Sequence, residues 1–151
     1  MKLPKKYVIV EIIPTHSNAK FGFIAQIQAL KIRDDKIIDR LDLRVRENEI
    51  ENKDLLSMIS YDKDMFTYLD RDEMMRKFSE FIENNPLLII DNFYTQDYLS
   101  ELKNNKISVF KVLNMEDSDD VFDKIMKKYQ LEPSNHLVDL LYESIVFENS
   151  K

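Results

Sequence analysis

Residues 7–13, YVIVEII, form a run rich in β-branched residues whose only charged member is Glu11. A run without polar alternation is typical of a strand that is buried on both faces, and such strands lie centrally in a sheet. Residues 21–31 and 37–45 follow as two further strands, and Asp34-Asp35-Lys36 between them predicts a tight turn. The sequence therefore predicts an antiparallel meander of three strands at the start of the chain.

The remaining chain carries two short apolar runs and five segments with helical features. The apolar runs, 86–90 and 107–113, are predicted as strands, and the helical segments are 52–59, 71–83, 95–103, 118–129 and 134–147. Either Asp70 or Asp72 is expected to cap the helix at 71–83. The order β-β-β-α-α-β-α-β-α-α predicts an α/β protein, a mixed five-stranded sheet with helices on both faces.

Composition limits the kinds of site that this chain can build. With 151 residues, of which 44% are hydrophobic, residues 1–151 are expected to form a single domain. The absence of cysteine excludes disulfides, thiolate nucleophiles and zinc sites built on cysteine, so any metal ion must be held by Asp, Glu or His. No apolar run reaches the ~18 residues that a membrane span needs, and a cytoplasmic protein without membrane association is expected.

Charge and glycine content add two further constraints. The net charge of −6 provides no overall positive field to attract nucleic acid, although nucleases that bind substrate through metal ions are themselves rich in carboxylates. Gly22 is the single glycine, so left-handed backbone positions are expected to fall to Asn and Asp, as in Asn84-Asn85 and Asn104-Asn105.

Four local motifs support a family resemblance over nearly the whole chain. Residues 11–16 (EIIPTH) are similar to the D-x-E-T-T-G motif of DnaQ-like (DEDD) 3′–5′ exonucleases, which include bacterial polymerase III proofreading subunits. Residues 57–60 and 77–82, then 90–96 (IDNFYTQ) and finally 134–139 (SNHLVD), resemble the middle region, the H-N-x-x-F-D motif and the H-x-A-L-x-D motif of that family. The resemblance implies a ribonuclease H-like fold.

The same resemblance implies a two-metal active site, in which four carboxylates hold the metal ions and a His or Tyr activates water. Laid over the family without gaps, the four carboxylate positions hold Glu11, Ile13, Gln96 and Asp139, and Ser134 stands at the general-base position. Ile13 cannot bind a cation, and Ser134 has no basicity near neutral pH. The overlay therefore predicts that hydrolysis by the family mechanism is impaired.

A shifted overlay keeps more of the site. If one residue is inserted after Asn92, Asp97 takes the third carboxylate position, and His136 lies three residues before Asp139 on one helix face. Glu11, Asp97, Asp139 and His136 could then form a reduced site for Mg²⁺ or Mn²⁺. In the alternative interpretation Asp97 is an exposed helix residue, His136 lies on the surface, and Asp139 is a vestige of the ancestral site.

Three other features have both a functional and a structural interpretation. Phe93, Tyr94 and Tyr98 follow a strand end, where they could stack on bases or pack in the core. His16 beside Thr15 suggests nucleophilic chemistry or a role in the loop, and the second is favoured because no motif ties another catalytic group to it. The acidic run 115–120 could bind a cation, but a helix-capping role is favoured.

Three functional hypotheses follow. The first is a catalytically inactive exonuclease-fold domain that needs no cofactor and binds nucleic acid ends or a protein partner from a replication, repair or defence complex. The second is an active Mg²⁺- or Mn²⁺-dependent 3′–5′ exonuclease with a reduced site. The third is a structural α/β scaffold. Because fold does not imply function, the choice depends on the geometry of the site.

Overall fold

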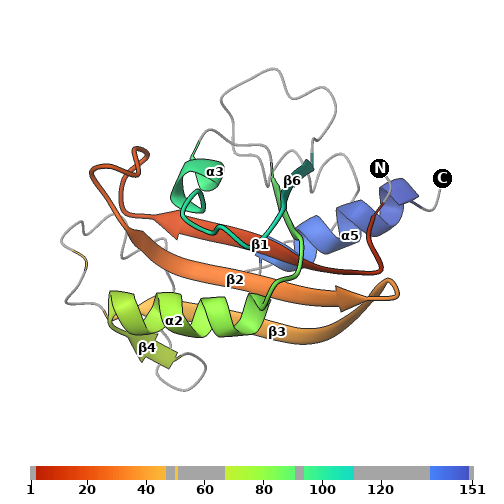
Figure 1. Ribbon diagram of the computed structural model, residues 1–151, viewed down its shortest axis with the longest axis horizontal. Helices are drawn as coiled ribbons and strands as arrows, with labels where there is room; N and C mark the ends of the chain where they lie inside the picture. The colour runs from red at the N-terminus through yellow and green to blue at the C-terminus, as the bar shows by residue number, and fades with distance from the viewer. Residues whose placement is uncertain (1–2, 47–49, 51–66, 91–93, 111–136, 150–151) are drawn as a thin grey trace.

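A computed structural model describes residues 3–46, 50, 67–90, 94–110 and 137–149 (Figure 1). Its elements in chain order are β1 (Lys6–Pro14), β2 (Ile24–Arg33), β3 (Lys36–Val45), β4 (Thr67–Leu69), α2 (Arg71–Ile82), β5 (Leu87–Ile90), α3 (Thr95–Tyr98), β6 (Ile107–Phe110) and α5 (Leu137–Asn149). The helices expected at 52–59 and 118–129 and the acidic run 115–120 lie outside the described residues. None of the described helices combines the length and apolar character needed to cross a bilayer.

The described strands form one mixed sheet in the order β4-β3-β2-β1-β5-β6. β1, β2 and β3 pair antiparallel, whereas β5, β6 and β4 each pair in parallel with a neighbour, so the predicted meander and the central place of β1 are confirmed. The predicted count of five strands is wrong, because β4 adds a sixth at the edge beside β3. Three residues are too few for strand periodicity to be visible in the sequence.

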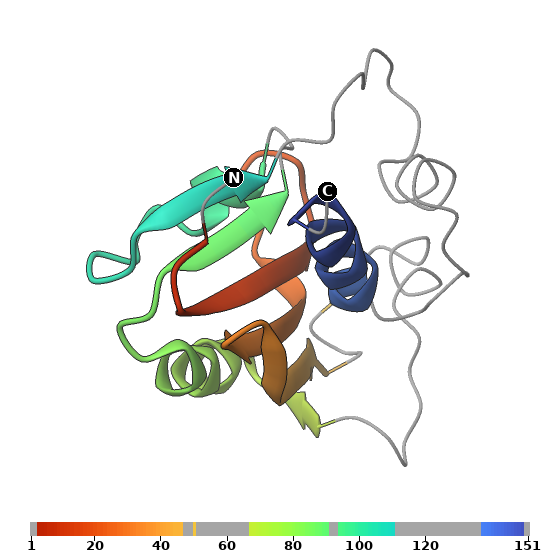
Figure 2. The ribbon, with the colours of Figure 1, turned by 90° about the vertical axis from the view of Figure 1, so that its right-hand side faces the viewer.

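Helices cover both faces of this sheet, as predicted (Figures 1 and 2). On one face, alternate β1 residues and the buried side of α2 form what we call the α2-side core, which includes Val8, Val10, Ile12, Met74, Phe78 and Ile82. On the other face, the intervening β1 residues and α5 form the α5-side core, which includes Tyr7, Ile9, Val138, Leu141 and Ile145. Successive strand side chains point to opposite faces, so β1 is buried between two cores.

Positive backbone φ angles occur at three described residues, and none of them is the asparagine that was expected. Asp34 and Asp35 have φ of 51° and 64° and close the tight turn between β2 and β3, while Glu83 has φ of 53° after α2. The expectation is thus confirmed for aspartate, at Asp34 and Asp35, and is wrong for Asn84-Asn85 and Asn104-Asn105. Asn85 and Asn105 instead use their side-chain amides as donors to backbone carbonyls.

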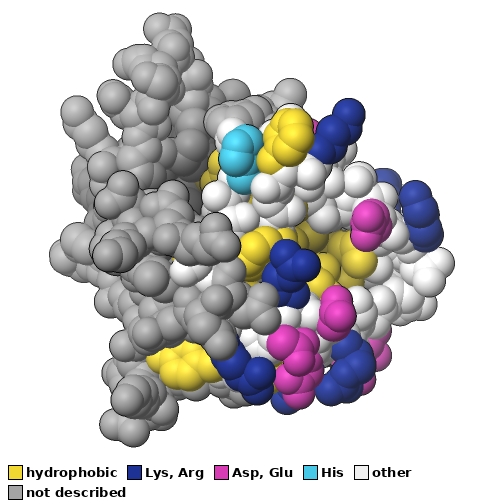
Figure 3. Space-filling view, turned by 90° about the vertical axis from the view of Figure 1, so that its left-hand side faces the viewer, with side chains coloured by type: hydrophobic (Ala, Val, Ile, Leu, Met, Phe, Trp, Pro, Cys, Tyr) yellow, Lys and Arg dark blue, Asp and Glu magenta, His cyan; other side chains and the backbone are white. Residues whose placement is uncertain are grey.

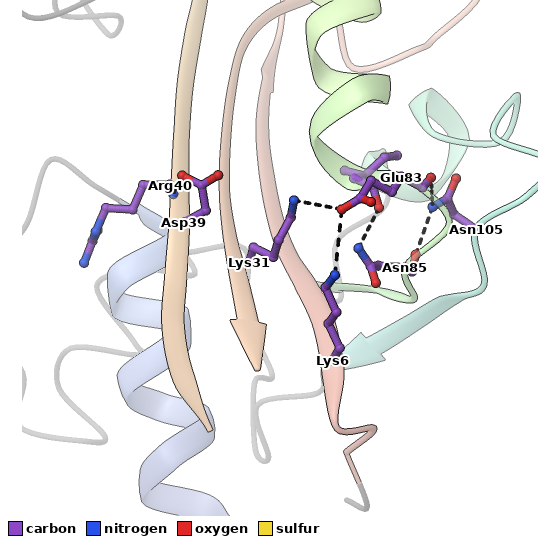
Figure 4. A network of polar contacts seen from close by, with 8 residues as sticks. Lys6, Lys31, Asp39, Arg40, Glu83, Asn85 and Asn105 are labelled. Carbon is purple, nitrogen blue, oxygen red and sulfur yellow. Dashed lines mark hydrogen bonds and ion pairs between the residues drawn. The ribbon is translucent and has the colours of Figure 1, made fainter. Parts of the chain in front are cut away.

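A polar network stabilises the chain reversal at Glu83 (Figure 4). The Glu83 carboxylate lies 3.1 Å from Lys31 Nζ and 3.8 Å from Lys6 Nζ, and the hydrogen bond and charge of Lys31 lower the pKa of Glu83. Asn105 Nδ2 donates to the backbone oxygens of Glu83 and Asn85 at 3.1 and 2.9 Å. The end of α2 is therefore joined to β1, to β2 and to the segment that precedes β6.

Several predicted boundaries differ from the structure. The helix expected at 95–103 is only the four residues of α3, because Ser100 donates from both its backbone N–H and its hydroxyl to the carbonyl of Asp97. A serine that bonds to nearby backbone in this way competes with helix continuation. The second strand begins at Ile24 instead of residue 21, because the preceding residues belong to the loop after β1. α5 extends to Asn149, two residues further than predicted.

Asp70 caps α2 through its side chain, which accepts a hydrogen bond from the backbone N–H of Glu73 at 2.8 Å. We expect Asp70→Ala to lower the free energy of unfolding by about 1 kcal/mol, because that N–H would lose its partner. Urea denaturation measures the change. Asp72→Ala is the matched control, since it removes a first-turn carboxylate that does not cap. A loss for Asp72→Ala as large as that for Asp70→Ala would contradict the assignment.

Candidate functional site

Glu11 lies near the carboxyl end of β1, on the face that packs against α5. It is 2% exposed, and its Oε2 is buried with no hydrogen-bond partner among the residues that the structure describes. Burial raises the pKa of this carboxyl from 4.5 to about 8, although a hydrogen bond with the backbone of Ile12 opposes the shift. In the folded protein the side chain is therefore mainly protonated at neutral pH.

A row of polar side chains continues from Glu11 across the same face of the sheet. Gln28 is the cross-strand partner of Glu11, and Asp42 on β3 is in turn the partner of Gln28. The Asp42 carboxylate accepts from Gln26 Nε2 at 3.1 Å and from Gln28 Nε2 at 3.5 Å. It also accepts from Nε and Nη2 of Arg44, both at 3.4 Å. We call Glu11, Gln26, Gln28, Asp42 and Arg44 the polar row.

The polar row and Arg40 hold the start of α5 on the sheet. The backbone N–H of Val138, in the first turn of α5, donates to Gln28 Oε1 at 3.4 Å. The next residue, Asp139, forms an ion pair in which its Oδ1 lies 2.6 Å from Arg40 Nη1. First-turn N–H groups lack partners within a helix, so an acceptor from the sheet satisfies one of them. Asp139 thus has a local role in docking α5.

The residues present do not fit the two-metal site that the family implies. The buried Oε2 of Glu11 is the one feature that a cation would suit, but a carboxyl with a pKa of about 8 must first lose its proton. Ile13 packs at the margin of the α2-side core, and Asp139 is already neutralised by Arg40. Among the described residues, which include Glu11, Asp97 and Asp139, no three Asp, Glu or His side chains come together as a metal site.

The third carboxylate position falls on α3. Gln96 and Asp97 are both exposed there, as the alternative interpretation expected for Asp97. His136 and Ser134 lie outside the described residues. The reduced site of Glu11, Asp97, Asp139 and His136 therefore stays a prediction, of which the structure assembles no part.

The aromatic residues after β5 take packing positions where they are described. Tyr94 and Tyr98 are partly buried against the α2-side core, and Phe93 lies outside the described residues. The Tyr98 hydroxyl donates to the carbonyl of His16, and burial raises the pKa of that phenol. Base stacking on these residues stays a prediction.

The loop between β1 and β2 is held against α3 by close contacts. A Cβ atom at Gly22 would lie 2.6 Å from the Tyr98 hydroxyl and 2.7 Å from His16 Cβ, so the single glycine of the chain permits the approach. His16 Nδ1 accepts from the backbone N–H of Asn18 at 2.9 Å, which confirms a role for this histidine in the loop. The loop thus has a defined shape at the carboxyl end of β1, beside α3 (Figure 1).

Comparison with known proteins identifies the fold. No protein-family model and no curated protein matches the sequence. Exonuclease I in complex with the inhibitor BCBP is similar in structure, with a TM-score of 0.63 and 9% identity over 95% of this chain. The zinc-ion-bound form of the Escherichia coli exonuclease I complex with single-stranded DNA has a TM-score of 0.61 and 7% identity over 97% of this chain. The chain has a ribonuclease H-like exonuclease fold.

This likeness confirms the fold that the sequence predicted. The chain spans 40% of the length of each of the two exonuclease I chains. Identities of 7% and 9% show the fold alone, so the assignment to the DnaQ-like family within it stays a prediction.

The sequence pattern did not single out the polar row beyond Glu11. A signal was present, because Gln26 and Gln28 alternate with apolar residues in β2, and Asp42 and Arg44 stand two residues apart in β3. Such spacing places each pair on one face of its strand. Only the cross-strand register and the packing of α5 show that this face is buried.

Replacing Glu11 by glutamine should stabilise the fold at neutral pH. Because the pKa is about 8 when folded and near 4.5 when unfolded, the folded state holds a proton that the unfolded state releases between these values. The Glu11 contribution is complete below about pH 4.5 and is lost as the pH rises to about 8, by on the order of 3 kcal/mol at pH 7. Glu11→Gln keeps the shape and does not titrate, so its advantage over wild type should grow across this range.

Urea denaturation of both proteins at about pH 5 and about pH 7.5 measures this difference. Asp97→Asn is the matched control, since it neutralises an exposed carboxylate at the same end of the sheet. If the stability difference between Glu11→Gln and wild type were the same at both pH values, Glu11 would not be the buried titrating group.

Proposed function

We propose that this chain is a non-hydrolytic domain of the exonuclease fold that acts by binding single-stranded nucleic acid. One observation carries the proposal: the two acids that remain at the family's carboxylate positions are committed to the fold. Glu11 is buried between sheet and helix, and Asp139 is paired with Arg40. A metal ion would have to displace the proton of the first and the arginine partner of the second.

Nucleic acid is the favoured ligand because the fold is shared with a protein solved on single-stranded DNA. The net charge of −6 argues against coating of duplex DNA, since phosphate binding needs clustered basic residues. A local site at the carboxyl end of the sheet agrees with both facts, because ligands approach α/β sheets at that end. A replication, repair or defence protein is the alternative partner.

A second candidate function is favoured by the buried Oε2 of Glu11, which has no hydrogen-bond partner within the described part of the chain. Mg²⁺ or Mn²⁺ could pair with this oxygen in a reduced site, and the chain would then be a metal-dependent 3′–5′ exonuclease. The metal would polarise a phosphate oxygen or a water molecule, which is the chemistry that carboxylate-bound divalent ions supply.

A nuclease assay separates the two candidates. We expect no shortening of end-labelled single-stranded DNA or RNA by the purified protein with Mg²⁺ or Mn²⁺, because no group of carboxylates is assembled. Product lengths on a denaturing gel give the result, and Asp139→Ala is the control. Degradation that appears with wild type and disappears with Asp139→Ala would overturn the non-hydrolytic assignment, whereas degradation shared by both reports a contaminant.

A binding assay tests the proposal directly. Fluorescence anisotropy of labelled single strands should rise with protein concentration, and the affinity should fall as salt increases, since phosphate contacts release counterions. A duplex of the same length should bind more weakly. No salt-sensitive binding to any single strand would leave a protein partner or a structural scaffold as the function.

A further inference from the structure

We infer that the loop between β1 and β2, residues 15–23, is a base-stacking site for single-stranded nucleic acid, with Phe21 as its main contact. The inference rests on the proposed function and names the surface that performs it. Phe21 belongs neither to the family motifs nor to the polar row, although its ring neighbour His16 is the last residue of the 11–16 motif.

Phe21 is unusually exposed for its size. It is 75% exposed, more than Ile38 at 49% or Val146 at 44%, the other large hydrophobic side chains found exposed in the described part of the chain. The edge of the His16 ring meets it in a T-shaped contact, with ring centroids 5.7 Å apart and planes at 71°. In Figure 3 a histidine, a hydrophobic and a basic side chain lie next to one another at the top of the view.

The loop that carries these rings is ordered by its own hydrogen bonds. Asn18 accepts from the backbone N–H of Lys20 through its side chain, and from that of Phe21 through its carbonyl. Thr15 and Phe23 are joined twice, because Thr15 N–H donates to the Phe23 carbonyl and Thr15 Oγ1 accepts from Phe23 N–H. An exposed ring on a preformed loop loses little conformational entropy when a flat ligand binds.

The charge around the loop favours a ligand that carries phosphate. Residues 12–33 contain no Asp or Glu, although the chain has 28 acidic residues, and Lys20 is the basic residue of this stretch that lies in the loop. Lys31 and Arg33 lie at the far end of β2, where Lys31 pairs with Glu83. Arg71 adds a further guanidinium whose Cζ lies 4.3 Å from the ring centroid of Phe23. A local basic surface in an acidic protein can attract a polyanion without an overall positive charge.

An unpaired base fits this surface better than a protein does. The other exposed residues of the loop are polar or charged, namely His16, Ser17, Asn18 and Lys20, and Phe21 is the one large hydrophobic side chain exposed within residues 15–23. Protein interfaces usually bury a contiguous apolar core, whereas a base can stack on one aromatic ring while a lysine contacts its phosphate. The ring of Phe21 is exposed, the loop is ordered, and residues 15–23 contain no Asp or Glu. Together these features indicate a binding site for single-stranded nucleic acid.

A tryptophan at position 21 would report stacking directly, because the chain contains no tryptophan. Phe21→Trp keeps an exposed aromatic ring, and we expect its emission to be quenched when a homopolymeric single strand is added. An abasic strand of the same length should cause no such quenching, since it supplies phosphates without bases. Ile38→Trp places the same probe at another exposed position, on β3, and its emission should stay unchanged.

Phe21→Ala should weaken binding of the single strand at least about fivefold in the anisotropy assay, since stacking of a base on an aromatic side chain contributes ~1–3 kcal/mol. The substitution removes an exposed side chain, and a circular dichroism melt equal to that of wild type would show that the fold is kept. Lys20→Ala should weaken binding by a smaller factor and reduce its dependence on salt.

The outcomes of these experiments distinguish the stacking site from the proposed function on which it rests. Salt-sensitive binding by wild type that Phe21→Ala retains in full, with no quenching of Phe21→Trp, would overturn the stacking site and leave the proposed function standing. If the wild-type protein binds no single strand, both the stacking site and the proposed function are overturned. A protein partner then becomes the expected ligand of the exposed ring. Quenching together with weakened binding by Phe21→Ala supports the inference.

Discussion

Burial of β1 on both faces is the constraint on which the rest of the structure depends. Every residue from Tyr7 to Ile12 is buried, and the alternate sides of the strand supply the centres of two separate cores. A strand that is buried on both faces normally carries apolar side chains at every position, so the charged residue Glu11 needs an explanation. Its protonated form is the one that the buried position stabilises. The carboxyl of Glu11 is thus part of the packing between sheet and helix.

The polar row explains how α5 is positioned over the face of the sheet that carries Glu11. The Asp42 carboxylate accepts hydrogen bonds from two glutamines and an arginine, which satisfies its oxygens in a region with little access to water. Gln28 and Arg40 then contact the first turn of α5 at Val138 and Asp139. The ion pair with Arg40 holds Asp139 at the start of α5. This face of the sheet therefore serves to dock α5, and the proposal of a binding function rests on that role.

Much of the fold was predictable from local pattern, and the site was predictable only in part. The meander, the central strand, the helix capped by Asp70 and the helices on both faces follow from hydrophobic period and capping residues. The sixth strand was missed because β4 has three residues. That Ile13 cannot bind a cation was visible from its side chain alone. The pairing of Asp139 with Arg40 was not, because 99 residues separate them in the chain.

The sequence by itself determined the order of the elements, the lack of cysteine chemistry and the apolar character of residue 13, because these depend on residue type and short-range spacing. It also contained the acid-free stretch of residues 12–33. Only the tertiary structure decided that Glu11 Oε2 is buried without a hydrogen-bond partner among the described residues, that Asp139 meets Arg40, and that Phe21 remains exposed on a loop anchored by Tyr98. Each of these depends on contacts between distant segments, and such contacts arise from packing of the whole chain rather than from local preference.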